Sequence, residues 1–319
     1  MVRFLIVRIL TGLLVLWLIS IAIFALFFLI PNNVARTLAG RQATPETIAL
    51  IEDRLGLDDP FWKQYLSFVN NALHGDLGYD YYHQVPVTHI IADALPITLS
   101  LALGASVIWL VLGVFNGVVS AVHPRSFVDR GLTAFSLFFY SMPSFLLGLV
   151  LLYFLYFRLT LAGFEWFPAG GYVPLSEGFG PWFNHLILPW LTLALLSAAI
   201  YTRLTRGTML DVLSEDYIKT ARAKGLSENR VIYRHALRSA LTPVATQFGI
   251  DLGALIGGVV VVETVFSLPG LGKVSIDAIN QQDLFVILGI FLFASAAVVV
   301  ANILVDIMYV ILDPRVRVH

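Results

Sequence analysis

Long apolar runs without charged residues limit what this chain can fold into more than any other feature. The first run, residues 9–30, contains no charged residue and as a helix would be about 33 Å long, enough to cross the hydrocarbon core of a bilayer. A cleaved signal peptide would have a shorter apolar core that ends at a small-residue cleavage site, whereas this run ends in Leu29, Ile30 and Pro31. We therefore predict an uncleaved first membrane span.

The composition extends this prediction to the whole chain. Hydrophobic residues make up 58% of the 319 residues and charged residues only 13%, which is typical of polytopic membrane proteins. We predict an all-α polytopic membrane protein with six transmembrane helices. The predicted spans are residues 9–30, 96–122, 131–157, a fourth that begins with 185–201, 241–262 and 284–312. Ser141, Met142 and Pro143 interrupt the third span and predict a local kink.

A polar, acidic segment separates the first two predicted spans. Residues 31–95 are predicted to form an external subdomain, with helices at 46–55 and 60–73 and a turn-rich loop at 74–87. Its role is left open between a passive connector and a cover over a transport pathway. Residues 96–312 form the predicted membrane domain.

The distribution of basic residues predicts the orientation in the membrane. Fourteen of the 20 lysines and arginines fall on one predicted side of the six spans. Because cytoplasmic loops carry an excess of Lys and Arg, both termini are predicted to be cytoplasmic.

Residues 207–240 are the longest polar interruption late in the chain and are predicted to form a cytoplasmic loop. Ser214 is a predicted helix cap, Gly225 a predicted break, and Ser227 the predicted start of a second helix. The resulting helix, turn and helix has a small-residue centre that another protein could approach closely. An amphipathic helix on the lipid surface is the alternative reading.

Two later spans carry small or acidic residues. Gly249, Gly253 and Gly257 recur every fourth residue and predict close helix packing. Asp251 lies on another face of the same helix and Asp306 lies in the sixth span, where carboxylates are costly unless they face polar partners or a cavity. A pathway role and a structural role are both open for Asp251.

Several function classes are excluded or disfavoured. The chain has no cysteine and its histidines are scattered, so neither a thiol nucleophile nor a metal site is expected. Residues 270–273, GLGK, resemble a phosphate-binding loop, but Val274 stands where that motif needs Ser or Thr. We therefore expect no enzyme active site, no bound cofactor and no nucleic-acid partner. A channel or a membrane receptor remains the alternative outside active transport.

Six ordered local motifs resemble those of ABC importer permeases of the dipeptide, oligopeptide and nickel family, and specifically the first of their two permeases. The motifs are residues 3–10 (RFLIVRIL), 74–78 (HGDLG), 141–143 (SMP), 215–227 (EDYIKTARAKGLS), 263–272 and 313–315 (DPR). Lys219 and Thr220 depart from the coupling motif of ABC importer permeases in general, which has a glutamate and an alanine there, but they resemble the form found in the dipeptide, oligopeptide and nickel permeases, where these positions are commonly basic or polar.

The resemblance implies half of a peptide pathway that works by alternating access. The implied partners are a homologous second permease, two cytoplasmic ATPase subunits that bind ATP and Mg, an external substrate-binding protein, a peptide substrate and the lipid bilayer. It also implies the cytoplasmic membrane of a bacterium or archaeon, with nickel as the alternative cargo.

The resemblance further assigns roles to individual residues. The expected ATPase-coupling residues are Glu215, Asp216, Ala221, Arg222, Lys224, Gly225 and Leu226. The expected pathway or gate residues are Asp251, Glu263, Phe266, Pro269, Gly270 and Asp306.

Overall fold

The computed structural model describes residues 2–29, 44–46, 48–50, 59–80 and 82–312, apart from the side chains of 2–5, 27–29, 253, 254, 256–258 and 304–312. These described residues are mainly helical, and their only extended pairing is a single bridge between Tyr79 and Pro86. Their contacts divide the chain into two compact units. The first holds the described residues of 1–96 and 274–303, and the second those of 97–273 and from 304 onward.

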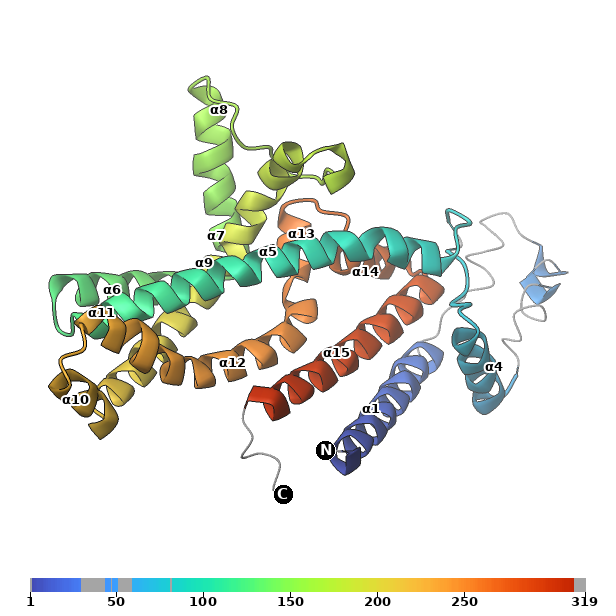
Figure 1. The fold of residues 1–319 in the computed structure, drawn as a ribbon. Helices are drawn as coiled ribbons and strands as arrows, with labels where there is room; N and C mark the ends of the chain where they lie inside the picture. Colours follow the sequence, from blue (N-terminus) through green and yellow to red (C-terminus); the bar gives the residue numbers. More distant parts are fainter. Residues whose placement is uncertain (1, 30–43, 47, 51–58, 81, 313–319) are drawn as a thin grey trace. The chain divides into compact units, whose positions relative to one another are not determined.

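The helices, shown in Figure 1, follow one another along the chain with few long connections. Their bounds are α1 Val2–Leu29, α4 Phe61–Leu73, α5 Val87–Val122, α6 Phe127–Tyr140, α7 Ser144–Leu151, a π-helical segment Leu152–Arg158, α8 Leu159–Leu161, a 3-10 turn Leu175–Glu177, α9 Phe179–Leu213, α10 Asp216–Ala223, α11 Glu228–Arg230, a second π-helical segment Val231–Ala236, α12 Leu237–Gly258, α13 Val260–Val265, α14 Leu271–Gln281 and α15 Leu284–Leu312.

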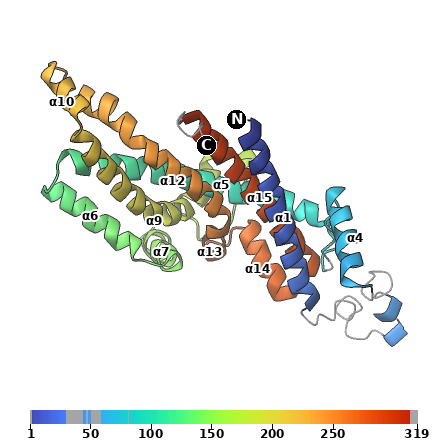
Figure 2. The ribbon, with the colours of Figure 1, turned by 90° about the horizontal axis from the view of Figure 1, so that it is seen from below.

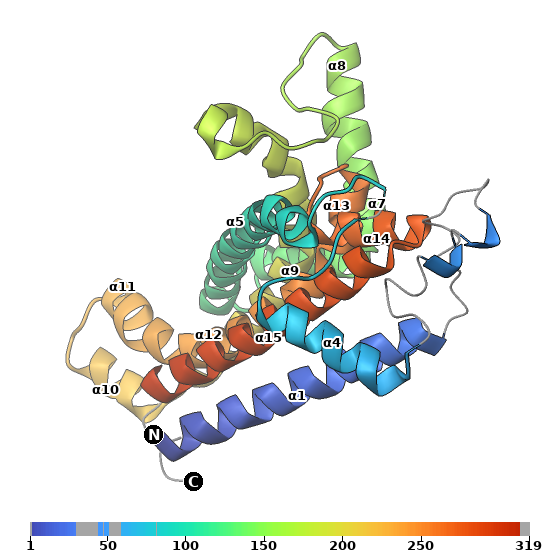
Figure 3. The ribbon, with the colours of Figure 1, turned by 90° about the vertical axis from the view of Figure 1, so that its right-hand side faces the viewer.

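In the first unit, α4 lies beside α1, as Figure 3 shows. Phe24 of α1 contacts the rings of Phe61, Tyr65 and Phe68, with centroids 5.5–5.6 Å away. Ser20 and the Tyr65 hydroxyl share a hydrogen bond of 2.8 Å beside this cluster. The amphipathic helix predicted at 60–73 is therefore confirmed, although Leu73, expected on its apolar side, is 81% exposed.

The second unit is built around α9, which packs against α6, α7 and α12. Figure 2 shows α6, α9 and α12 running side by side, with α10 at one end of them. Glycines of α5 allow a close approach to α9, since a Cβ atom on Gly104 or Gly113 would overlap the side chain of Trp190 or Tyr201. This small-residue packing site was not predicted, because sequence reasoning placed its glycine strip on the fifth span instead.

Five described helices are long and apolar enough to cross a membrane: Ile6–Leu26, Val87–Val122, Ser144–Leu161, Phe179–Leu213 and Leu284–Ile303. The sixth predicted helix has the predicted bounds, since α15 begins at Leu284 and ends at Leu312. The predicted fifth span, 241–262, is divided between α12 and α13 around Val259 and is not among the five. The predicted count of six is therefore not confirmed.

Two predicted boundaries were wrong. The third span does not run from 131 to 157, because α6 ends at Tyr140 and α7 begins at Ser144 with Pro143 as its N-cap residue. The predicted kink is thus a complete break between two helices. The second helix begins at Val87 rather than 96 and continues through Pro96, which transmembrane helices tolerate when neighbouring groups satisfy the freed backbone.

Candidate functional site

The predicted loop at 207–240 contains the expected turn between two helical segments. α10 ends at Ala223 and Gly225 follows with φ +76°, a left-handed conformation that favours glycine. The Gly225 N–H donates to the carbonyl of Arg222 (2.9 Å) and the Leu226 N–H to that of Ala221 (3.4 Å). This pair of bonds is a Schellman motif, which satisfies the last carbonyls of a helix. The predicted break at Gly225 is confirmed.

One face of α10 is buried and the other is exposed. Ile218 and Ala221 pack in an apolar cluster with Val231, Ile232 and Ala236 of the following segment. Leu226 is partly buried against the same cluster. Ala221 therefore faces the interior of its own unit, where it helps to hold α10 in place.

Four charged side chains expected to contact a partner lie on the exposed surface of this loop: Glu215, Asp216, Arg222 and Lys224. Glu215 is the N-cap residue of α10, so the prediction that Ser214 caps this helix was wrong. Ser214 instead ends α9, where its hydroxyl donates to the carbonyl of Asp211 at 2.7 Å.

Arg222 is engaged within the loop itself. Its guanidinium Nη2 lies 2.7 Å from a carboxylate oxygen of Glu228, so the ion pair joins α10 to α11 across the Gly225 turn. The hydrogen bond from Arg222 holds the pKa of the Glu228 carboxyl below its usual value. Within this chain, the exposed Arg222 is therefore paired with Glu228, and its contact with a partner stays a prediction.

A buried ion pair fixes the end of α9 that leads into this loop. Arg206 of α9 donates two hydrogen bonds to Asp129 of α6, from Nε at 2.7 Å and from Nη2 at 2.8 Å. Ser120 of α5 and the backbone N–H of Arg125 also donate to the Asp129 carboxylate. The hydrogen bonds from Arg206, followed by that from Ser120, hold the pKa of Asp129 far below its usual value despite burial. Three helices therefore meet at one carboxylate.

Sequence reasoning missed this cluster. It used the lysines and arginines only as indicators of the cytoplasmic side of the membrane. Asp129 is the single acidic residue of the basic turn at 123–130. That contrast was the available signal, but it does not identify a partner 77 residues away.

Four of the residues expected at a gate lie in α13 and in the tightly packed turn that follows it. Glu263 is fully buried, and its carboxylate accepts hydrogen bonds from the Thr98 hydroxyl (2.6 Å) and the Lys273 N–H (3.0 Å). The Thr98 hydroxyl in turn accepts from the Leu271 N–H at 2.9 Å. Glu263 therefore connects α5 to the start of α14 from inside its unit.

Burial differs among the other gate residues. Phe266 and Leu268 lie in the main apolar core of the second unit, and Gly270 is buried where a Cβ atom would overlap the Glu263 carboxylate. Pro269 is exposed between them. Most of the segment is thus buried within its own unit. It leads into α14, a helix that the sequence analysis did not predict.

The remaining predicted residues do not form one cluster with the gate. Asp251 of α12 accepts hydrogen bonds from the Tyr201 hydroxyl of α9 (2.7 Å) and from Gln247 (2.8 Å), which favours a structural role between these helices. Gly249 is buried on α12. The surroundings of Gly253 and Gly257, and the side chain of Asp306, lie outside the described structure.

Two observations on the described side chains concern metal and nucleotide binding. Within that part of the chain, no three His, Asp or Glu residues come together as ligands would. Gly272 and Lys273 of the GLGK sequence begin α14, where the Lys273 N–H is bonded to Glu263 rather than free to hold a phosphate. The arrangement offers helix packing, a helix–turn–helix surface and a buried carboxylate turn.

Comparison with known proteins gives consistent matches along the chain. Residues 110–318 match the family model of the binding-protein-dependent transport system inner membrane component, and residues 1–102 match the N-terminal model of such membrane components. The chain is 39% identical to a probable peptide ABC transporter permease protein, y4tP, of Sinorhizobium fredii over 97% of both proteins. It is 42% identical to the oligopeptide transport system permease protein AppB of Bacillus subtilis over 83% of both.

A solved structure is similar in fold. It is an inward-facing conformation of the MetNI methionine ABC transporter, with a TM-score of 0.56 and 17% identity over 70% of this chain and 96% of that one.

Proposed function

Because the chain belongs to the family of binding-protein-dependent transport system inner membrane components, we propose that it is the permease subunit of an ATP-driven peptide importer. We assign peptide as the cargo because the chain is similar, over most of its length, to permeases named for peptide and oligopeptide transport. The five apolar helices are consistent with a multi-pass membrane protein. Under this proposal it lies in a cytoplasmic membrane with both termini inside.

The proposed complex contains four further kinds of subunit or ligand. A homologous second permease completes the pathway, two cytoplasmic ATPases bind ATP and Mg, and an external binding protein delivers the peptide. The chain itself supplies no nucleotide-binding site in this proposal. Binding of ATP draws the ATPases together, and alternating access follows if they contact the two conformations of the permease differently.

The exposed surface of the loop at 207–240 is the proposed ATPase contact. Glu215, Asp216 and Lys224 present charges there, while the Gly225 turn sets the angle between α10 and the next segment. Ala221 and Leu226 hold α10 on its cluster, and Arg222 braces the turn through Glu228. A force on α10 would reach α9 directly, because only Ser214 and Glu215 separate these helices.

The turn at 263–270 is the proposed external gate. Glu263, Phe266 and Gly270 anchor it, and exposed Pro269 is the part available to move or to meet the cargo. Asp251 and Asp306 remain proposed pathway residues, with Asp251 in its present conformation bonded to Tyr201.

The experiment is to reconstitute the chain with the second permease and the ATPases in lipid vesicles. ATP hydrolysis and uptake are then measured with binding protein that is empty, loaded with short peptides or loaded with nickel. We expect stimulation by the peptide-loaded protein. Stimulation only by the nickel-loaded protein would make nickel, not peptide, the cargo. Failure of any ATPase to co-purify would contradict the proposed ATPase contact at the loop.

A further inference from the structure

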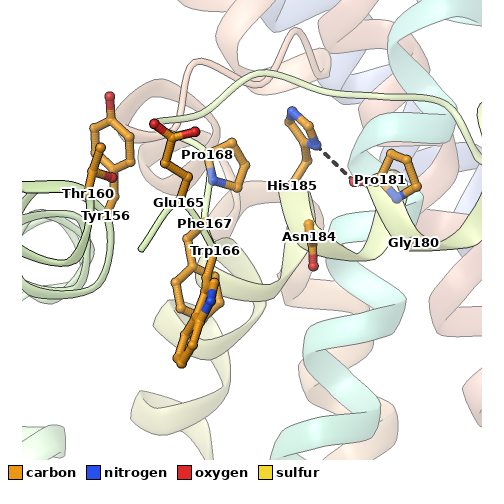
Figure 4. A pocket seen from close by; sticks show the side chains of 10 residues that line it. All are labelled: Tyr156, Thr160, Glu165, Trp166, Phe167, Pro168, Gly180, Pro181, Asn184 and His185. Carbon is orange, nitrogen blue, oxygen red and sulfur yellow. Dashed lines mark hydrogen bonds between the residues drawn. The ribbon is translucent and has the colours of Figure 1, made fainter. Parts of the chain in front are cut away.

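A pocket of about 660 Å³ in the second unit has no role in the proposed function (Figure 4). Tyr156 and Thr160 line it from the end of the candidate span Ser144–Leu161, and Asn184 and His185 line it from the start of the span Phe179–Leu213. The pocket therefore lies where one span ends and the next begins, at one boundary of the membrane. Its volume is within the range of sites for small organic ligands.

His185 presents a defined hydrogen-bonding atom to this pocket. Its Nδ1 lies 2.8 Å from the carbonyl oxygen of Pro181, and since a carbonyl only accepts, Nδ1 carries the hydrogen. In the neutral ring, Nε2 is then an acceptor. Figure 4 shows the Glu165 carboxylate and the His185 ring on either side of Pro168.

The pocket carries a negative charge on the Glu165 carboxylate, which is exposed to solvent. No hydrogen bond or ion pair holds the Glu165 carboxylate within the described residues, and the ten described residues that line the pocket include no lysine or arginine. The side-chain oxygens of Thr160 and Asn184 add acceptors. The rings of Tyr156 and Trp166 add aromatic faces, which attract cations.

This combination fits an organic cation better than a metal ion. A hard cation such as Ca²⁺ takes six or more oxygen ligands, often several of them carboxylates, whereas this pocket has one carboxylate among aromatic rings. An ammonium group has three donors and no acceptor, which matches a pocket whose lining includes a carboxylate and other acceptors.

We infer that this pocket binds a primary ammonium group carried by a small molecule, with Glu165 as its counter-ion. Two sources carry that group at a membrane boundary: the free amino terminus of a short peptide and the ethanolamine headgroup of a lipid. The peptide source rests on the proposed function, whereas the lipid source does not.

The test uses the complete permease–ATPase complex without its binding protein, in lipid nanodiscs made of phosphatidylcholine and phosphatidylglycerol. The probe is a tripeptide with a photoreactive diazirine in its first side chain, and cross-links are mapped by mass spectrometry. Wild-type cross-links should fall within 156–185 and should weaken about tenfold when the peptide is N-acetylated, the loss expected from one charge-assisted hydrogen bond. Glu165→Gln should weaken them equally, and acetylation should then have no further effect. Glu177→Gln is the matched control, because Glu177 is exposed on the same segment but does not line the pocket.

The lipid source is tested in the same complex with photoreactive phosphatidylethanolamine and its N-trimethylated counterpart. Cross-linking at the pocket that requires both the free amine and Glu165 supports an ammonium site, whichever ligand gives it. If only the ethanolamine lipid cross-links to the pocket in this way, the site binds lipid. Uptake assays then test the proposed function separately. Equal labelling by free and blocked amines for both ligands, or equal labelling of wild type and Glu165→Gln, would overturn the inference.

Discussion

Replacing Asp129 with asparagine should destabilise the folded chain by about 2–3 kcal/mol. Breaking a fully buried ion pair by removing one partner costs about 3–5 kcal/mol, since the other charge stays buried and unpaired. The Arg206 side chain retains 31% exposure, so water can partly solvate its unpaired charge and the expected loss lies below that range. Asparagine keeps the size of the side chain, which separates the effect of charge from that of packing.

The free energy of unfolding can be measured by titrating SDS into mixed micelles of the purified chain and following helical circular dichroism. Glu228→Gln is the matched control, because it removes the exposed partner of Arg222 and should leave the midpoint unchanged. The double variant Asp129→Asn with Arg206→Gln should recover part of the loss by removing the unpaired charge. If Asp129→Asn and Glu228→Gln have the same midpoint, the buried pair does not stabilise this unit as argued.

Three further predictions concern the second unit. Gly225→Val should lower the free energy of unfolding by about 1–2 kcal/mol, because a β-branched residue is strained at φ +76°, and should reduce uptake per ATP hydrolysed. Gly207→Val, at an open helical position, should retain coupling of uptake to ATP hydrolysis. Equal coupling in both variants would argue against a role of the Gly225 turn. Thr98→Val should lower the free energy of thermal unfolding by about 1–3 kcal/mol, because it removes a hydrogen-bond donor from buried Glu263. Thr98→Ser keeps the hydroxyl and should behave as wild type. A valine variant as stable as wild type would show that this hydrogen bond is dispensable. Arg206 lowers the pKa of Asp129 in the folded state. The pair therefore stabilises the chain at any pH above the unfolded-state pKa of about 4, and this contribution is lost as the pH falls toward the lower folded-state pKa. Wild type should therefore lose stability more steeply below about pH 4 than Asp129→Asn, and parallel pH profiles would contradict the assignment.

Features that depend on neighbouring residues in the chain were predicted well. Residues 284–312 contain only one charged residue, Asp306, and α15 has these bounds because length and hydrophobicity decide whether a helix suits a bilayer. The turn at Gly225 was predicted for a similar reason, since a glycine after a short helical pattern is a local signal for its end.

Predictions from local sequence failed where the same residue type allows a helix either to continue or to end, because packing decides between the two outcomes. Pro96 and Pro143 are both prolines in apolar surroundings. Helix α5 nevertheless continues through Pro96, whereas helix α6 ends before Pro143. The residue type is the same, so the difference lies in whether surrounding groups support a continuous helix.

The sequence by itself determined the membrane class of this protein, the last transmembrane helix and the glycine turn of the polar loop. Only the tertiary structure decided the partners of its buried charges. Arg206 meets Asp129 across 77 positions and Glu263 meets Thr98 across 165. A buried carboxylate must have hydrogen-bond partners, but its own sequence neighbourhood does not say which distant helix supplies them.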